Sequence, residues 1–403
     1  PTPGRSESPH ALRRVHRLTP PMPQQPRPFD QPVFVTRPLL PPLEGYVERL
    51  REIWASGWLA NGGDQHQRLE AALAAHLGSP HLSLFNNGTI GLIVACQALR
   101  LSGEVITTPF SFPATPHVLS WNAVTPVFAD VEPGTMNIDP ARIESLITGR
   151  TTGILGVHVY GTPCQVDAID DLARSYGLKV IYDGAHAFGA QIDGRPIASF
   201  GDATMFSFHA TKLFHTAEGG ALAVRDAPTK RRIDLLKNFG IKNEHEVVMP
   251  GINGKMSELS AALGLEVLAC VDAERAKRQR VADIYLSRLA RHDCVVPLRP
   301  PANVRDSLQY FVVRIDATRT GVSRDQLHDR LRECNIVTRK YFYPLCSQYS
   351  CYRHLPSAQP AQLPVATRLS TEVLCLPFFG GLTDDDAHRI CDAIDWGLGG
   401  PSR

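Results

Sequence analysis

Short apolar segments alternate with helical segments through much of the first 224 residues of this 403-residue chain. Strands are expected at residues 81–85, 104–109, 125–130, 152–160, 179–183, 203–208 and 221–224, and helices between them at 90–99, 117–121 and 166–176. β-Branched strands that are separated by helices predict an α/β domain with a mainly parallel sheet. Ligands of such sheets bind beyond the carboxyl ends of the strands. Residues that follow these strands are therefore expected to share one site.

One lysine follows the expected strand at 203–208, in the stretch Ser207-Phe208-His209-Ala210-Thr211-Lys212. Most single lysines are solvated loop residues, but burial lowers the pKa of the amine, which can then form a Schiff base with an aldehyde. The strand at 179–183 ends on Asp183. A lysine and an aspartate at neighbouring strand ends are the pair that pyridoxal phosphate needs, because one holds the aldehyde and the other keeps the pyridine nitrogen protonated.

A third strand end carries a turn that suits a phosphate group. Asn86-Asn87-Gly88-Thr89 joins the strand at 81–85 to the helix at 90–99, so that free N–H groups and the helix dipole would face an anion. Alone this turn is a weak signal, since many such turns only cap helices. Phe112 and Ser207 also follow strands, and this convergence of strand ends predicts a single site.

Composition excludes several classes of function. The net charge of +2 gives no reason to expect nucleic acid or a charged membrane surface as a partner. No apolar run approaches the roughly 20 residues of a membrane helix. The nine cysteines include no CxxC pair, which excludes a standard zinc knuckle, predicts no metal site and suits a reducing, cytoplasmic location.

The chain is long enough for a large and a smaller domain. Residues 1–40 are rich in proline, arginine and small polar residues and are expected to be a disordered leader, without the apolar region of a secretory signal. A large domain is expected at 41–255, and a smaller α+β domain at 256–403.

Five motifs together resemble the DegT/DnrJ/EryC1/StrS sugar aminotransferases, of the aspartate aminotransferase-like group of pyridoxal phosphate enzymes (fold type I). The motifs are Asn86-Asn87-Gly88-Thr89, Asp183-Gly184-Ala185-His186-Ala187, Ser207-Phe208-His209-Ala210-Thr211-Lys212 with Glu218-Gly219-Gly220, Gly251-Ile252-Asn253-Gly254-Lys255-Met256-Ser257-Glu258, and Tyr341-Phe342-Tyr343-Pro344-Leu345. The likeness runs from about residue 33 to the end. It implies a mainly parallel seven-stranded sheet in the large domain, with pyridoxal 5′-phosphate as the cofactor.

The resemblance assigns the central residues of this site. Lys212 would carry the cofactor and move the reacting proton, and Asp183 would pair with the pyridine nitrogen. Gly88, Thr89 and Ser207 would bind the phosphate. A serine satisfied by its own local backbone is the alternative for Ser207, and a capping aspartate at a strand end is the alternative for Asp183.

The remaining assignments have closer alternatives. Phe112 would stack on the cofactor ring, or is simply packed in the core. His186 stands where many members have glutamine and would bind the phenolic oxygen, or is a core histidine. Asn253 would reach the phosphate of a neighbouring subunit, which implies a homodimer with shared active sites, or is an ordinary turn residue.

The resemblance implies L-glutamate as amino donor and a nucleotide-linked keto-deoxy sugar as acceptor. The Phe-His-Ala-Thr-Lys…Glu-Gly-Gly form is similar to members that act at C4 of dTDP-4-keto-6-deoxy-D-glucose. Members that act at C3 more often have a Gly-Asp-Gly ending, and a C3 aminotransferase is the alternative. Residues 339–343, basic and aromatic, are a candidate contact for the sugar nucleotide or a packed edge of the small domain.

The residues disfavour three other classes of protein. Dehydratases of the family carry histidine at the lysine position, so Lys212 disfavours a dehydratase. A regulatory protein that binds the cofactor without turnover is disfavoured by the intact pair of Lys212 and Asp183. A nicotinamide-linked Rossmann enzyme requires G-x-G-x-x-G after an early strand, which residues 87–91 do not supply.

Overall fold

The expected strands form one seven-stranded sheet in the computed structural model, which describes residues 24–400. The sheet order is β2-β10-β9-β6-β5-β3-β4. The strands are β2 (Leu82–Phe85), β3 (Glu104–Thr107), β4 (Thr125–Phe128), β5 (Thr151–Val157), β6 (Lys179–Asp183), β9 (Ala203–Ser207) and β10 (Gly220–Val224). Only β10 runs antiparallel to its neighbours in this sheet. The predicted fold class, α/β with a mainly parallel seven-stranded sheet, is confirmed.

Helices cover both faces of this sheet, as buried parallel strands require. Val180 and Tyr182 of β6 face one core, whereas Ile181 between them faces the other, because side chains alternate along a strand. The first core is closed by α2 (Asp64–His76), α6 (Val166–Tyr176) and the start of α8 (Glu258–Leu289). The second core is closed by α3 (Gly88–Ala98), α4 (Ala114–Trp121) and α7 (Ala227–Leu236).

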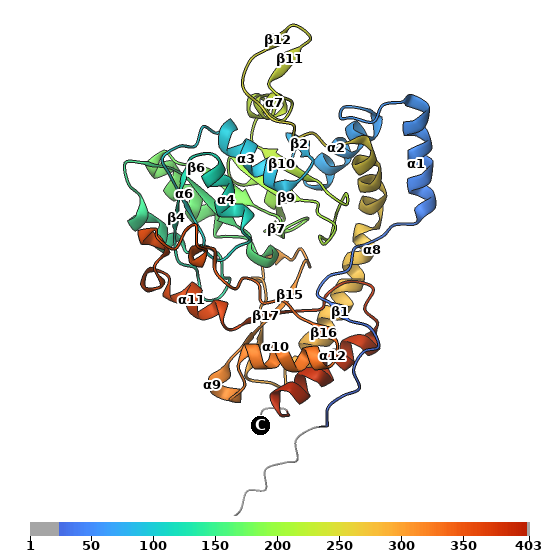
Figure 1. Cartoon of the computed structure of the whole chain (residues 1–403), viewed down its shortest axis with the longest axis vertical. Coiled ribbons are helices and arrows are strands. Elements are labelled where there is room, and N and C mark those ends of the chain that lie inside the picture. The colour runs from blue at the N-terminus through green and yellow to red at the C-terminus, as the bar shows by residue number, and fades with distance from the viewer. Residues whose placement is uncertain (1–23, 401–403) are drawn as a thin grey trace, which may run out of the picture.

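The long helix α8 joins the two domains, and Figure 1 shows it running along one side of the molecule from the sheet to the small domain. Val267 and Val271 pack in a core of the large domain, whereas Val281 and Tyr285 pack in the core of the small domain. The expected division at residue 255 therefore falls before a helix that both cores share.

The small domain is built on a three-stranded antiparallel sheet that helices cover. Its elements are β13 (Val295–Pro297), β15 (Phe311–Ile315), β17 (Val373–Leu376), α9 (Ala317–Thr320), α10 (Arg324–Glu333), α11 (Pro364–Ser370) and α12 (Asp384–Leu398). An apolar cluster joins this domain to the large one, since Phe110 and Phe128 of the large domain pack with Val312, Phe342 and Cys375. The two domains are thus held by apolar contact as well as by α8.

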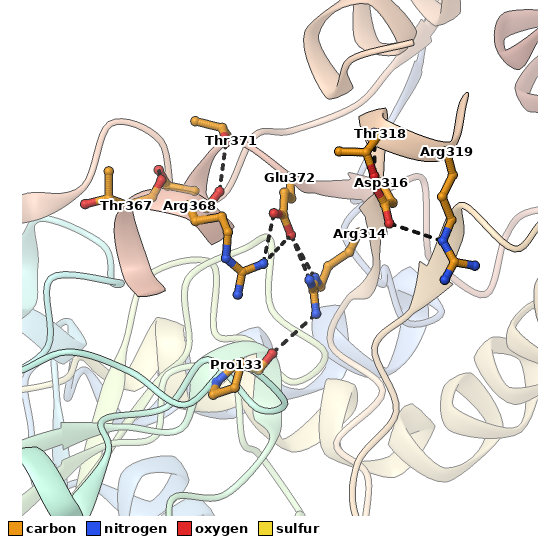
Figure 2. A network of polar contacts seen from close by, with 10 residues as sticks. Pro133, Arg314, Asp316, Thr318, Arg319, Thr367, Arg368, Thr371 and Glu372 are labelled. Carbon is orange, nitrogen blue, oxygen red and sulfur yellow. Dashed lines mark hydrogen bonds and ion pairs between the residues drawn. The ribbon is translucent and has the colours of Figure 1, made fainter. Parts of the chain in front are cut away.

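A polar network reinforces the same boundary (Figure 2). Glu372 accepts hydrogen bonds from Arg314, 2.8 Å from its Nη2, and from Arg368, 3.0 Å from its Nη1. Arg314 also reaches the carbonyl oxygen of Pro133 in the large domain, at 3.5 Å. Because these groups keep some exposure to solvent, the network adds little to the stability of the fold.

The expected leader lies partly outside the described residues, which begin at 24. Residues 29–35 do not match the expectation of disorder. Phe29 is buried in the small-domain core, and β1 (Val33–Phe34) pairs in parallel with β16 (Ile336–Val337). The proline-rich segment is ordered here because its extended backbone finds strand and core partners about 300 positions later.

Several smaller elements lie outside the two main sheets. They are α1 (Leu43–Ser56), α5 (Pro140–Ile143), the sheet of β7 (Gln191–Ile192), β8 (Arg195–Pro196) and β14 (Val304–Arg305), and the hairpin of β11 (Ile241–Asn243) and β12 (Glu246–Val247). The hairpin projects from the top of the molecule beyond α7 (Figure 1). Within residues 24–400, no helix has both the length and the hydropathy for a bilayer crossing.

Candidate active site

A cavity of about 400 Å³ lies at the carboxyl ends of the central strands, between the two domains. Seven of the eight residues predicted to bind the cofactor lie in its wall: Gly88, Thr89, Phe112, Asp183, His186, Ser207 and Lys212. The topology brings them together because parallel strands end at the same edge of the sheet. Arg339 and Tyr341, from the segment expected to contact a sugar nucleotide, line the same cavity.

Lys212 lies in the loop after β9 and is partly enclosed at the cavity wall. Its backbone N–H donates to the carbonyl of His209 at 2.9 Å. Burial lowers the pKa of its amine to about 8, while the carboxylate of Asp183 acts in the opposite direction. A substantial fraction of the amine is therefore neutral near pH 8, as a nucleophilic lysine requires.

Asp183 is the last residue of β6 and is only 5% exposed. Burial raises the pKa of its carboxyl group. Hydrogen bonds from the Thr115 hydroxyl, at 2.8 Å, and from the Ala185 N–H, at 3.0 Å, oppose that rise by stabilising the ionised form, and the charge of Lys212 does the same. The site thus holds a carboxylate in a poorly solvated place, where its charge acts strongly on any cation beside it.

The N-terminus of α3 borders the cavity next to Ser207. Asn87 caps the helix, since its Oδ1 accepts the Ile90 N–H at 2.8 Å. Gly88 and Thr89 begin the helix, so their N–H groups have no partner within it. A Cβ on Gly88 would lie 2.7 Å from Sδ of Met205 and 3.3 Å from Cβ of Ser207, so close packing favours glycine here.

Two rings form part of the cavity wall. Phe112 is 55% exposed, so packing in the core, the alternative considered for it, does not describe its environment in this chain. His186 is buried, lies parallel to Phe342 and meets Tyr310 edge to face, with centroids 5.9 and 5.0 Å away. Burial holds the pKa of His186 well below its ordinary value, so the ring is neutral, and its Nδ1 has no hydrogen-bond partner.

Asn253 lies outside this cavity. It borders a neighbouring groove of about 830 Å³ that shares Thr89 and Phe112 with the cavity. Its Oδ1 accepts a hydrogen bond from Lys255 Nζ at 2.8 Å. The role expected for Asn253 in the site of a neighbouring subunit stays a prediction.

Sequence reasoning assigned no role to Thr115 or Tyr310, although Thr115 bonds Asp183 and Tyr310 lines the cavity. Thr115 and Phe112 stand in the same stretch, which follows the expected strand at 104–109. The position of Thr115 after a strand end could therefore have marked it as a site residue. Tyr310 comes from the small domain, and no local pattern marks it.

The residues present fit pyridoxal phosphate. Unpaired N–H groups at a helix N-terminus suit its phosphate. A buried carboxylate suits its protonated pyridine, and a neutral histidine in the cavity wall suits its phenolic oxygen. The amine with a lowered pKa suits its aldehyde. The lysine, the carboxylate and the helix N-terminus at one edge of this sheet define an aspartate aminotransferase-like protein of fold type I.

The chain belongs to the DegT/DnrJ/EryC1/StrS aminotransferase family, whose profile matches residues 44–395. It is 45% identical over 364 residues to the dTDP-4-amino-4,6-dideoxy-D-glucose transaminase of Escherichia coli. The aligned residues cover 90% of this chain and 97% of that protein. It is 42% identical over 366 residues to the transaminase of the same name from Shigella dysenteriae, covering 91% and 99%.

A solved structure shares the fold closely. DesI, crystallised in the presence of its TDP-sugar product, superimposes with a TM-score of 0.87 at 39% identity, covering 91% of this chain and 93% of DesI. The predicted resemblance to the family is thereby confirmed.

Proposed function

We propose that this chain is a pyridoxal phosphate-dependent aminotransferase that moves the amino group of L-glutamate to C4 of dTDP-4-keto-6-deoxy-D-glucose. The observation that carries the proposal is the amine of Lys212, with its pKa lowered to about 8, in one cavity with the carboxylate of Asp183. The names of the relatives from E. coli and S. dysenteriae and the TDP-sugar product of DesI support the choice of substrate and of C4 over C3.

Bound pyridoxal phosphate would supply an aldehyde that condenses with amines and a ring that accepts electrons. Asp183 would hold a proton at the pyridine nitrogen. Gly88 and Thr89 would hold the phosphate through their N–H groups, with the hydroxyl groups of Thr89 and Ser207 beside them. His186, neutral and in the cavity wall, would accept or donate at the phenolic oxygen.

Lys212 would move a proton in both halves of the reaction. A group with a pKa near the operating pH can take a proton in one step and return it in another. A pKa of about 8 for Nζ of Lys212 meets that condition better than the ordinary value of 10.5. One amine would therefore serve donor and acceptor substrates in turn.

We infer that residues 339–343 contact the nucleotide sugar. The backbone of Arg339 is fixed by two hydrogen bonds to Cys375, at 3.2 and 2.8 Å, while its guanidinium lies exposed at the cavity. A guanidinium is a good partner for a diphosphate or carboxylate group, since its N–H donors form a planar fork. Binding energy from the nucleotide would then position the keto carbon, which is far from the phosphates.

We also infer a homodimer with shared active sites. Beside the cavity, Asn253 borders a groove flanked by the exposed side chains of Trp121 and Ile252. The projecting hairpin exposes Ile241 and Val247. Apolar surface of this kind favours cover by another subunit.

Subunit mixing tests the shared site. Dimers of a Lys212→Met chain with an Asn253→Ala chain would contain one site with both Lys212 and Asn253, so activity should reappear on mixing two impaired proteins. Persistently low activity in verified mixed dimers would contradict sharing.

A cytoplasmic location is part of the proposal. All nine cysteines lie within residues 24–400, and none of them forms a disulfide in the part of the chain that the structure describes. Free thiols are the normal state in a reducing compartment.

The substrate assignment is tested by incubating the loaded enzyme with L-glutamate and a panel of dTDP-keto sugars, and identifying the amino sugar by NMR. We expect a 4-amino-4,6-dideoxyglucose product. Amination of 3-keto sugars alone would show the C3 alternative. A glutamate half-reaction without any sugar product would contradict the substrate class, and no half-reaction at all would favour a regulatory protein.

A further inference from the structure

A glutamine of the small domain holds the backbone on both sides of Lys212. Gln309, which precedes β15, is 2% exposed. Its Oε1 accepts the N–H of Leu213 at 2.8 Å, and its Nε2 donates to the carbonyl of Thr211 at 3.1 Å. These two groups belong to the peptide units immediately before and after Lys212. One side chain thus satisfies both, and an apolar residue would leave both without this partner.

The segment that carries Gln309 is itself firmly held. Arg275 donates to the carbonyl oxygens of Asp306 and Ser307, at 2.6 and 3.0 Å, and Arg278 donates to that of Leu308 at 3.1 Å. Leu308 adopts a left-handed backbone conformation, with φ of +58°. This backbone turn directs the chain from the arginine contacts into the position of Gln309.

Arg278, one of the two arginines that hold this segment, is part of a buried ion pair on α8. Arg278 is completely buried and meets Glu274 at 2.8 Å, while the same glutamate oxygen accepts the N–H of Gly380 at 2.8 Å. A buried and hydrogen-bonded pair moves little, because losing one partner would leave an isolated charge. The position of Gln309 is therefore tied to the helix that both domains share.

The next residue, Tyr310, contacts two other residues of the cavity wall. Its ring meets His186 at a centroid distance of 5.0 Å and Tyr341 at 5.8 Å. Two consecutive residues thus link the small domain to the lysine loop and to the cavity lining. A shift of this segment would move both.

We propose that Gln309 is a positioning residue, whose carboxamide fixes the backbone of Lys212 and thereby aims the amine at the reacting atoms. The inference rests on the role proposed above for Lys212. The lysine side chain has several rotatable bonds, so a defined position of Nζ needs a defined backbone. The two hydrogen bonds of Gln309 also link the position of the small domain to the catalytic lysine.

The test compares Gln309→Met with Gln65→Met. Methionine keeps the length and bulk of glutamine but makes neither hydrogen bond. Gln65 is equally buried, at 1%, and its amide bonds Arg49 and Glu52, at 3.1 and 2.7 Å, on α1. The control therefore removes a buried amide pair without a contact to the lysine loop.

For Gln309→Met we expect kcat to fall by about tenfold or more, since small errors in placement cost that much, with the KM for the sugar within about twofold of wild type. In the chain without cofactor, hydrogen exchange should become faster in a peptide that contains the Leu213 amide. Gln65→Met should show neither change. Wild-type kcat in Gln309→Met, or a kcat loss equal to that of Gln65→Met, would overturn the proposal.

A second variant decides the matter if Gln309→Met does not fold. Gln309→Glu keeps the acceptor for Leu213, but its ionised form sets a carboxylate oxygen against the carbonyl oxygen of Thr211 in place of the donor, so kcat should fall by at least roughly threefold, as expected for one lost hydrogen bond. Wild-type kcat in this variant would then overturn the proposal. Failure of the role of Lys212 itself is distinguishable, because it would show in the wild-type enzyme as absence of cofactor from that residue.

Discussion

The hydroxyl group of Thr115 donates a 2.8 Å hydrogen bond to Oδ2 of Asp183, and the Ser111 hydroxyl lies 2.7 Å from the same Thr115 oxygen. Both hydroxyl groups are buried. Burial raises the pKa of Asp183, and the hydrogen bond from Thr115 is the largest of the effects that oppose this rise. An ionised Asp183 is the form that would pair with a protonated pyridine nitrogen.

Thr115→Val should therefore weaken cofactor binding. Valine has the same shape but donates no hydrogen bond, so the pKa of Asp183 should rise further. A hydrogen bond to a charged group contributes about 1.5–3 kcal/mol, which corresponds to a loss of roughly tenfold or more in affinity. Titration of the cofactor-free chain with pyridoxal phosphate measures this. Ser111 bonds Thr115 and not the carboxylate, so Ser111→Ala should lose less affinity for the cofactor. Equal affinities for Thr115→Val and wild type would contradict the role assigned to Thr115.

Gly88→Ala should close the space expected for the phosphate. The added Cβ would lie 2.7 Å from Met205 Sδ, and either the Met205 side chain or the helix start must shift to relieve that contact. We expect the dissociation constant for pyridoxal phosphate to rise by about tenfold, on the order of one lost hydrogen bond to a charged group. Gly91→Ala is the matched control in the same helix, because its nearest atoms would lie at 3.7 Å. If both variants bind alike, the phosphate is held elsewhere.

Lys212→Met should stabilise the cofactor-free chain near pH 7. The amine has a pKa of about 8 in the folded chain and about 10.5 when exposed, so below pH 8 folding buries a charged lysine at a cost. Between pH 8 and 10.5 the unfolded chain binds more protons than the folded one, and the stability of the wild type rises with pH. The advantage of Lys212→Met should shrink over that window. Denaturant unfolding of both proteins at several pH values measures the difference, and a constant difference would contradict the lowered pKa.

His186 should tolerate glutamine better than leucine. The neutral imidazole of His186 lines the cavity and can offer a polar atom to the cofactor, and a glutamine amide can replace it. His186→Leu offers no such group and should lose a few-fold to about tenfold in cofactor affinity, as expected for one neutral hydrogen bond. Equal losses in both variants would show that the histidine serves packing against Phe342 and Tyr310 instead.

The parts of the site that the sequence predicts are those that local patterns carry. Lys212, Asp183 and Gly88 each follow a short apolar strand, and parallel strands must end at one edge, so their meeting in a cavity follows from the strand pattern. The mainly parallel sheet follows from the same alternation of strands and helices.

The parts that the sequence does not predict depend on contacts between distant segments. Gln309 bonds Leu213 across 96 positions, and that contact requires the backbone turn at Leu308 and the buried Arg278 of α8. The pairing of Val33 with Ile336 likewise orders a proline-rich segment that has the composition of a disordered one. Neither contact has a period or motif in the sequence that would reveal it.

The most direct test of this account is to find which amine carries the cofactor. The wild-type chain, loaded with pyridoxal phosphate, is reduced with borohydride, digested and mapped by mass spectrometry. We predict a single covalent label, on Lys212, and none in Lys212→Met. A label on another lysine, or a chain that takes up no pyridoxal phosphate, would contradict the account.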